Sequence, residues 1–237
     1  LVFTACHPVL SLEAQVALLM QKGVHTLDLL NWFLGGTPTK VYATGNLAYF
    51  GGDQPNDKRC RDCDRASACP FFVRWDRFLM DYGETIEKPD GCVFAQEVDA
   101  NDNSQVLISY ANGKHGVYTE CHFTPEYTRD FELVGDKGKM NALYNNECNF
   151  VIRNQYRHTD HVDEWHPKSA GGGHGGGDPR IQQAFLDWVR DPERMDVAQV
   201  LAARDATCVG AAAEESIETG MPVEIPPAPK LVSTPDT

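Results

Sequence analysis

The feature that most constrains the fold is a run of short apolar segments, separated by turn-forming residues, within residues 92–153. We predict a strand over each of the segments 92–98, 105–110, 116–122, 128–134, 140–144 and 148–153. Asn112-Gly113 lies between two of these segments and is a strong signal for a tight hairpin. Because closely spaced strands pair with their neighbours in sequence, this region predicts an antiparallel meander.

Helical patterns lie on both sides of the meander. Residues 11–35 have an apolar face, and we expect Gly23 to break them into two helices. After the meander, Asp178 as N-cap and Pro179 as first residue predict a helix that runs to about Val189. A second helix is predicted over 196–218.

Two further strands are predicted outside the meander, at 41–50 and as a short edge strand at 223–225. The sum is an α+β fold: an open, mostly antiparallel β-sheet with helices packed on one face. The chain has 237 residues, which favours one large domain over two.

The net charge argues against a nucleic-acid partner, and the length of the apolar stretches argues against a membrane span. The chain has 21 basic and 34 acidic residues, a net charge of -13, so its surface repels phosphate backbones and we expect no nucleic-acid partner. The apolar stretches are too short to span a membrane, and the first residues lack the pattern of a signal peptide. We therefore expect a cytoplasmic protein in which most of the eight cysteines are reduced.

Cys60, Cys63 and Cys69 form a cluster with a spacing seen in metal sites. Thiolates suit zinc or an iron–sulfur centre, but a closed zinc site needs four ligands. Cys121, His122 or another residue would have to complete it. The alternative is three reduced thiols in a surface loop.

His25 follows Gly23 at the expected start of a helix, and its unperturbed pKa near 6.5 suits proton transfer at neutral pH. Lys22 or Asp28 is placed to tune it. The alternative is a structural histidine whose ring bonds to backbone groups.

A glycine run, 171–177, encloses His174 and satisfies G-x-G-x-x-G literally. No strand precedes it, so we do not interpret it as a dinucleotide fingerprint. Its glycines allow the backbone to approach a ligand closely, which favours a pocket-lining loop over a plain linker. The segment 158–166 is rich in His and acidic residues but matches no defined metal motif, and we interpret it as a solvated loop.

The order and spacing of several motifs resemble the Gfo/Idh/MocA oxidoreductases, relatives of glucose–fructose oxidoreductase and inositol dehydrogenase. The matching motifs are Gly23-x-His25-x-x-Asp28-Leu29-Leu30-x-Trp32-x-x-Gly35, Tyr110-x-Asn112-Gly113, Arg129-x-Phe131, Gly172-Gly173-His174-Gly175-Gly176-x-Asp178 and Ala212-x-x-Glu215-Ser216-Ile217-x-x-Gly220. The cysteine cluster resembles an insertion in one branch of this family. The resemblance begins at about residue 17 and concerns the C-terminal domain of the family alone.

The resemblance implies a division of the chain. Residues 17–225 form the C-terminal-like α+β domain, residues 1–16 are an N-terminal remnant that fits neither half of the family, and residues 226–237 are a Pro-rich tail. In the family, an N-terminal Rossmann domain binds NAD or NADP. No such domain is recognised in this chain, so the cofactor would be bound by a domain absent from it.

The resemblance also implies roles for single residues. His25 matches the family histidine that assists proton transfer from a substrate hydroxyl, but Gln21 stands where members often carry an aspartate, and Lys22 is a candidate substitute. His174 and Asp178 would hold hydroxyls of a sugar- or polyol-like substrate. A homo-oligomer would form through the sheet face.

Three functions remain open from the sequence. The first is the substrate-binding and oligomerisation domain of an NAD(P)-dependent dehydrogenase. The second is a catalytically silent binding module, which Gln21 favours. The third is a metal-binding protein that uses Cys60, Cys63 and Cys69.

Overall fold

The computed structural model describes residues 18–73, 90–145, 150–168, 176–191 and 197–228. The chain divides into two compact units, one of residues 1–123 with 197–237 and the other of residues 124–196. Among the described helices, none is long and apolar enough to cross a membrane.

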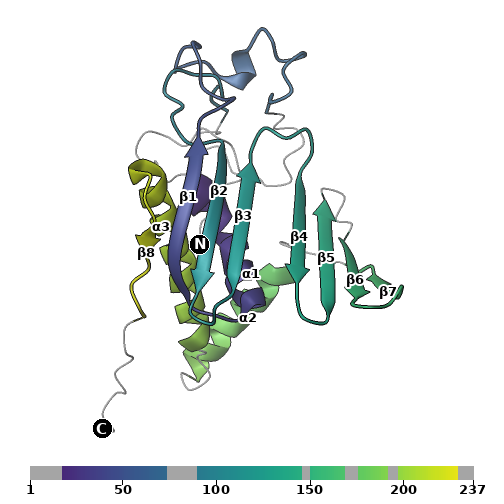
Figure 1. Cartoon of the computed structure of the whole chain (residues 1–237). Helices are drawn as coiled ribbons and strands as arrows, with labels where there is room; N and C mark the ends of the chain where they lie inside the picture. The colour runs from purple at the N-terminus through teal and green to yellow at the C-terminus, as the bar shows by residue number, and fades with distance from the viewer. Residues whose placement is uncertain (1–17, 74–89, 146–149, 169–175, 192–196, 229–237) are drawn as a thin grey trace. The chain divides into compact units, whose positions relative to one another are not determined.

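The first unit contains a four-stranded sheet with the strand order β3-β2-β1-β8 (Figure 1). Its strands are β1 (Pro38–Asn46), β2 (Asn103–Tyr110), β3 (His115–Cys121) and β8 (Val223–Glu224). All three pairings are antiparallel. Gly113 turns β2 into β3 with a φ of 78°, a left-handed conformation that glycine adopts without strain, so the predicted hairpin is confirmed.

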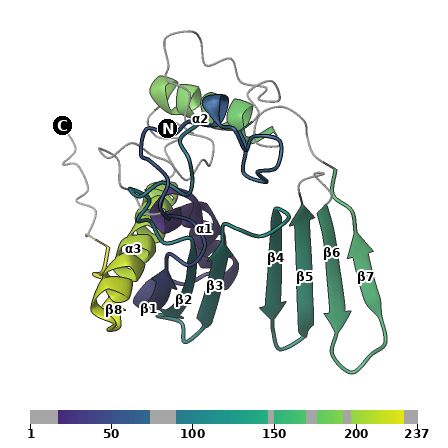
Figure 2. The ribbon, with the colours of Figure 1, turned by 90° about the horizontal axis from the view of Figure 1, so that it is seen from above.

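Helices cover one face of this sheet (Figure 2). The π-helical turn η1 (Leu19–Gly23) leads into α1 (Val24–Leu34), and α3 (Val197–Thr219) packs against both α1 and β1. The core between helices and sheet is aliphatic and is built mainly from Leu19, Leu27, Val41, Ala43, Val106, Ile108, Val209 and Ala213. Burial of such side chains is worth roughly 25 cal/mol per Å² and is the main force that holds the helices on the sheet.

The second unit contains a separate four-stranded antiparallel sheet with the order β4-β5-β6-β7 (Figure 2). Its strands are β4 (Thr128–Val134), β5 (Gly138–Asn145), β6 (Phe150–Tyr156) and β7 (Val162–Trp165). One helix, α2 (Gly177–Arg190), belongs to this unit.

The two faces of the second sheet differ in chemistry because side chains alternate along each strand. On one face, the cross-strand partners along the four strands are Phe131, Ala142, Ile152 and Trp165. On the other face the cross-strand partners are Glu132, Asn141, Arg153 and Glu164. Asn141 Nδ2 donates to Glu132 Oε2 at 3.2 Å, and Arg153 Nε to Glu164 Oε2 at 2.5 Å.

The α+β fold class is confirmed, and all pairings between named strands in the described ranges are antiparallel. Two local predictions within residues 92–166 are wrong. Residues 92–98 form turns with one isolated bridge, at Ala95, because several of their backbone hydrogen bonds go to residues 51, 54 and 58 rather than to a neighbouring strand. The segment 158–166, predicted to be a solvated loop, contains β7, which pairs with β6 through a turn in which His158 has a φ of 61°.

Candidate functional site

The sequence-predicted catalytic residues lie on the continuous helical segment formed by η1 and α1. Gly23 has helical angles, φ -57° and ψ -37°, so the predicted helix break is wrong. Lys22 lies in η1, and His25 is the second residue of α1 with a half-buried side chain. Single π-helical turns within helices are frequent at functional sites.

The need for glycine at position 23 comes from close packing of η1 on β3. A Cβ atom there would lie 2.9 Å from Leu19 Cδ1, 3.2 Å from Tyr118 Cε1 and 3.2 Å from Glu120 Oε2. Glycine is thus required by proximity rather than by backbone angle. The same contact places the Glu120 carboxylate directly beneath the turn that carries the predicted catalytic residues.

Glu120 belongs to a buried polar cluster on the inner side of β3. Its side chain is 6% exposed, and Tyr118 donates its hydroxyl hydrogen to Glu120 Oε2 at 2.8 Å. His122 Nε2 lies 3.7 Å from the same oxygen, while Glu120 Oε1 has no hydrogen-bond partner. A buried carboxylate oxygen without a hydrogen-bond partner is costly, which makes Glu120 a candidate for a functional residue.

Glu214 on α3 adds a second carboxyl to this cluster. Burial, together with the negative charges of Glu120 and Glu218, raises the pKa of Glu214 above its ordinary value. Sequence analysis missed both glutamates because each lies in an otherwise regular strand or helix. The signal that was available is the alternation Tyr118-x-Glu120-x-His122, which puts three polar residues on one face of a strand.

The predicted substrate-binding residues belong to the other unit. His174 lies outside the described residues, so its position stays a prediction. Asp178 lies in the first turn of α2, whose N-cap is Gly176 with a φ of 95°. The prediction of Asp178 as N-cap is therefore wrong by two positions, but its carboxylate still lies where it favours the helix dipole.

The cysteine cluster is brought together in part as predicted. Cys60, Cys63 and Cys69 line one pocket of about 20 Å³, and Cys92 lines it as well. All four are free thiols. Cys121 and His122, considered as a fourth ligand, are not in the pocket wall. In the described part of the chain, no group of three or more His, Cys, Asp or Glu side chains is already arranged to hold a metal ion.

The pKa of the Cys60 thiol depends on its surroundings in the thiol pocket. Burial raises the pKa of the Cys60 thiol, the backbone N–H of Val73 lowers it, and the charges of Asp90, Cys69 and Cys92 raise it further, for a net increase. At neutral pH Cys60 is therefore a protonated thiol and a poor nucleophile.

The segment 158–166 forms local pairs rather than a shared site. His161 Nε2 lies 2.8 Å from Asp163 Oδ1, and His166 Nε2 lies 2.8 Å from Glu164 Oε1. The two histidines are each 66% exposed and Asp163 and Glu164 are 32% and 38% exposed, so these pairs lie at the surface, in agreement with the solvated segment that we predicted.

An open pocket of about 490 Å³ lies beside the turn after β6, with Lys139, Tyr156, Arg157 and Asp160 in its wall. Its main cation is already bound, because Arg157 donates from Nε to Asp136 O at 2.9 Å and from Nη2 to Gly135 O at 3.2 Å. We assign no ligand to this pocket.

Comparison with known proteins gives one family. Residues 13–225 match the model of the Gfo/Idh/MocA oxidoreductase family, C-terminal alpha/beta domain. YteT of Bacillus subtilis, described as an oxidoreductase, is 27% identical over 207 residues, which are 74% of this chain and 47% of YteT.

Solved structures with similar folds carry oxidoreductase names. An oxidoreductase domain protein from Kribbella flavida matches with a TM-score of 0.57 and 16% identity over 88% of this chain and 51% of its own. Levoglucosan dehydrogenase matches with a TM-score of 0.55 and 17% identity, with the same coverage. An Agrobacterium radiobacter oxidoreductase, solved with NAD+, L-tartaric acid and magnesium, has a TM-score of 0.51 and 15% identity over 86% of this chain and 48% of its own. The chain thus spans about half the length of the relatives it matches.

Proposed function

The chain belongs to the Gfo/Idh/MocA oxidoreductase family, of which it matches the C-terminal domain, and we propose that it is the substrate-binding and oligomerisation part of an NAD(P)-dependent dehydrogenase. Its substrate is a sugar, a polyol or a related hydroxyl compound. The family match over most of the chain is the observation that carries this proposal. Two fold neighbours, levoglucosan dehydrogenase and an aldose-aldose oxidoreductase from Caulobacter crescentus, have names that refer to sugars and support the substrate class.

In this proposal His25 is the proton-transferring residue. Oxidation of an alcohol requires a base that takes the hydroxyl proton, and an imidazole does so at neutral pH. Lys22, three residues before His25 in the helical segment, supplies a positive charge that stabilises the developing alkoxide. His174 and Asp178 bind hydroxyl groups of the substrate.

The hydride acceptor is a nicotinamide bound outside this chain. The described residues contain no parallel βαβ unit with a phosphate-binding glycine turn, so they do not fit the cofactor and none is assigned to it. The part of this chain in the reaction is to orient the substrate and to move the hydroxyl proton.

The test is turnover of the full-length enzyme that contains this domain, assayed by NAD(P)H formation with a panel of sugars, polyols and sugar acids. We expect His25→Ala to lower kcat by about 10²–10⁴-fold, the range for loss of a general base. We expect His174→Ala mainly to raise KM, because a hydroxyl-binding residue acts on ground and transition states alike. His115→Ala, at an exposed position on β3, is the matched control.

A catalytically silent binding module is the second candidate, and Gln21 is the observation that favours it, since an amide is neither an acid nor a base at neutral pH. In that case the full-length protein binds sugars in calorimetry without any turnover. A selective loss of turnover in folded His25→Ala rules this candidate out. If His25→Ala unfolds, or turns over as fast as His115→Ala, the catalytic role of His25 is wrong.

A further inference from the structure

Four cysteine thiols line one small pocket in the first unit, although only three of them are close in sequence. Cys60, Cys63 and Cys69 lie within ten residues, whereas Cys92 comes from a later segment. The remaining wall is largely apolar and aromatic, with Phe71 among its residues. Thiols from two distant segments therefore converge on one small cavity.

Backbone pairing brings the two segments together. Arg59 and Gly91 form an isolated antiparallel bridge. Next to it, the backbone N–H of Cys60 donates to Asp90 O at 2.7 Å, and that of Cys92 donates to Lys58 O at 3.0 Å. This bridge fixes Cys60 and Cys92 on neighbouring backbones.

Two turns bring Cys63 and Cys69 back to the pocket that Cys60 and Cys92 line. The N–H of Cys63 donates to Cys60 O at 3.1 Å, across the short 3₁₀ turn η2 (Cys60–Asp62). The N–H of Cys69 then donates to Arg65 O at 3.0 Å. Folding of this kind, with two cysteines on one tight turn, is how structural zinc sites present their first pair of ligands.

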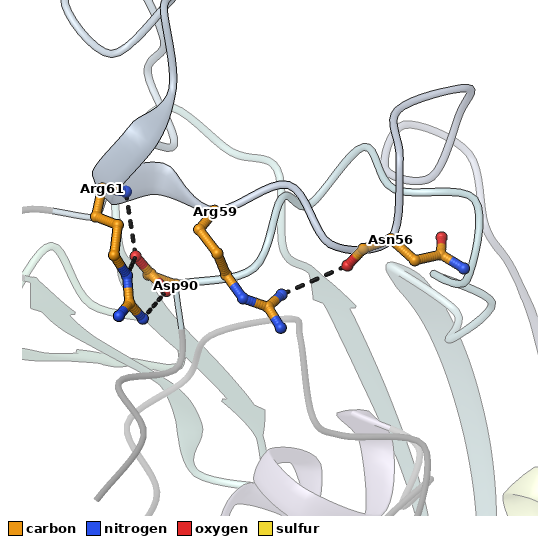
Figure 3. Close-up of polar contacts among 4 residues, drawn as sticks. All are labelled: Asn56, Arg59, Arg61 and Asp90. Atoms are coloured by element: carbon orange, nitrogen blue, oxygen red, sulfur yellow. Dashed lines mark hydrogen bonds and ion pairs between the residues drawn. The ribbon is translucent and has the colours of Figure 1, made fainter.

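An ion pair secures the loop from outside the pocket (Figure 3). Asp90 is fully buried and accepts from Arg61 Nε at 2.8 Å, Arg61 Nη2 at 2.6 Å and the Arg61 backbone N–H at 3.1 Å. In the same view, Arg59 Nη1 donates to the backbone oxygen of Asn56 at 3.4 Å. Bidentate pairs of this kind give geometric precision, so the loop that carries three of the thiols is held in place.

We propose that Cys60, Cys63, Cys69 and Cys92 bind one zinc ion. Four sulfur ligands suit the tetrahedral preference of zinc. The cavity of about 20 Å³ has room for a single ion and is too small for a four-iron cluster. A zinc ion with four thiolates has a net charge of -2, and Lys58 and Arg59 in the pocket wall provide the balancing positive charge.

The backbone contacts bring the four cysteines to one pocket, and zinc would bind there to their sulfur atoms. In the described part of the chain no three such side chains are arranged to hold a metal ion, so zinc binding in this proposal requires the four thiols to move toward one another. In this proposal, movement of the side chains brings the four sulfurs to zinc–sulfur distances of about 2.3 Å. Each thiol releases its proton to solvent as its sulfur bonds to zinc, so no oxidant or other reactant is needed.

The test is the metal content of the full-length protein, purified under reducing conditions without chelators and again after exposure to zinc salts. We expect one zinc per chain by elemental analysis, released when a mercurial reagent blocks the thiols. In the cobalt-substituted protein we expect a thiolate-to-cobalt charge-transfer band. Loss of the metal should lower Tm, because a ligand bound by the folded state alone stabilises it.

Single substitutions identify the ligands. Cys92→Ser should lose the metal, whereas Cys121→Ser and Cys208→Ser, outside the pocket, should keep it. If Cys92→Ser does not fold, Cys92→His serves instead, since it should retain zinc and shift the cobalt spectrum toward three sulfurs and one nitrogen. The proposal is wrong if neither preparation contains zinc, if iron replaces it, if the four cysteines are found in disulfides, or if Cys92→Ser retains full metal.

Discussion

Glu214 illustrates what a single buried carboxyl contributes to pH dependence. Burial first, and then the charges of Glu120 and Glu218, raise its pKa above the ordinary 4.5. The fold therefore favours the neutral form of Glu214 over the charged form. The contribution of Glu214 to stability is fully present below pH 4.5 and is lost as the pH rises through the raised pKa.

We predict that Glu214→Gln, which keeps the shape but not the charge, stabilises the protein at pH 8 by about 1 kcal/mol, a typical size for a single substitution. At pH 4 the variant and the parent should have nearly equal free energies of unfolding, because the parent carboxyl is then neutral in both states. Urea denaturation at the two pH values measures this. Glu215→Gln, at an exposed position of the same helix, should show no such change. Equal effects of Glu214→Gln at both pH values would contradict the prediction.

At the scale of the element, the helical segment η1–α1 contains Gly23, although helix propensity alone disfavours glycine within a helix. Alanine is favoured over glycine in a helix by about 1 kcal/mol, so propensity alone predicts that Gly23→Ala stabilises the protein. The packing on β3 reverses that sign. A methyl group at position 23 would lie 3.2 Å from both Tyr118 Cε1 and Glu120 Oε2 on β3, and 2.9 Å from Leu19 Cδ1, which is fully buried.

We predict that Gly23→Ala destabilises the protein by about 1–3 kcal/mol, the usual cost of overpacking. Gly210→Ala on α3 is the matched control. There the three atoms nearest to the methyl group all belong to Met20, the closest being its sulfur at 2.5 Å, near the end of a flexible and half-buried side chain. Thermal unfolding of both variants makes the comparison. A gain in Tm for Gly23→Ala would show that η1 is not tightly packed against β3.

At the scale of the whole molecule, the sheet of the first unit has one face that its helices do not cover. Tyr42, Leu107 and Val117 stand directly opposite one another on β1, β2 and β3. They are 44%, 48% and 66% exposed. This apolar row is the surface through which we propose that two copies of the protein associate.

We predict that Leu107→Glu, at the centre of the row, shifts the full-length protein toward monomer, because it places two carboxylates in an apolar interface. Sedimentation velocity over a range of concentrations measures the shift, and we expect at least about a tenfold rise in Kd. Val200→Glu, an equally exposed position on α3, should leave the oligomeric state unchanged. A monomeric parent protein, or an oligomer insensitive to Leu107→Glu, excludes this face as the interface.

Much of the fold follows from local patterns. The strand 128–134 and the hairpin at Asn112-Gly113 were predictable because alternation and turn chemistry act within a few residues. The helix 196–218 differs from α3 by one residue at each end for the same reason. The predictions failed where bonding partners are distant. Residues 92–98 resemble a strand in composition, but their backbone groups pair with residues 51, 54 and 58 across the cysteine loop.

The sequence by itself determined the α+β class, the antiparallel pairing and the three clustered thiols, since these depend on spacing along the chain. Tertiary structure alone decided that Gly23 lies in an unbroken helix, that Glu120 lies beneath it beside Glu214, and that Cys92 joins the thiol pocket. The physical reason is common to all three. Each depends on a contact between residues distant in sequence, and such contacts are created by the packing of helices on a sheet or of one loop on another, which no local pattern encodes.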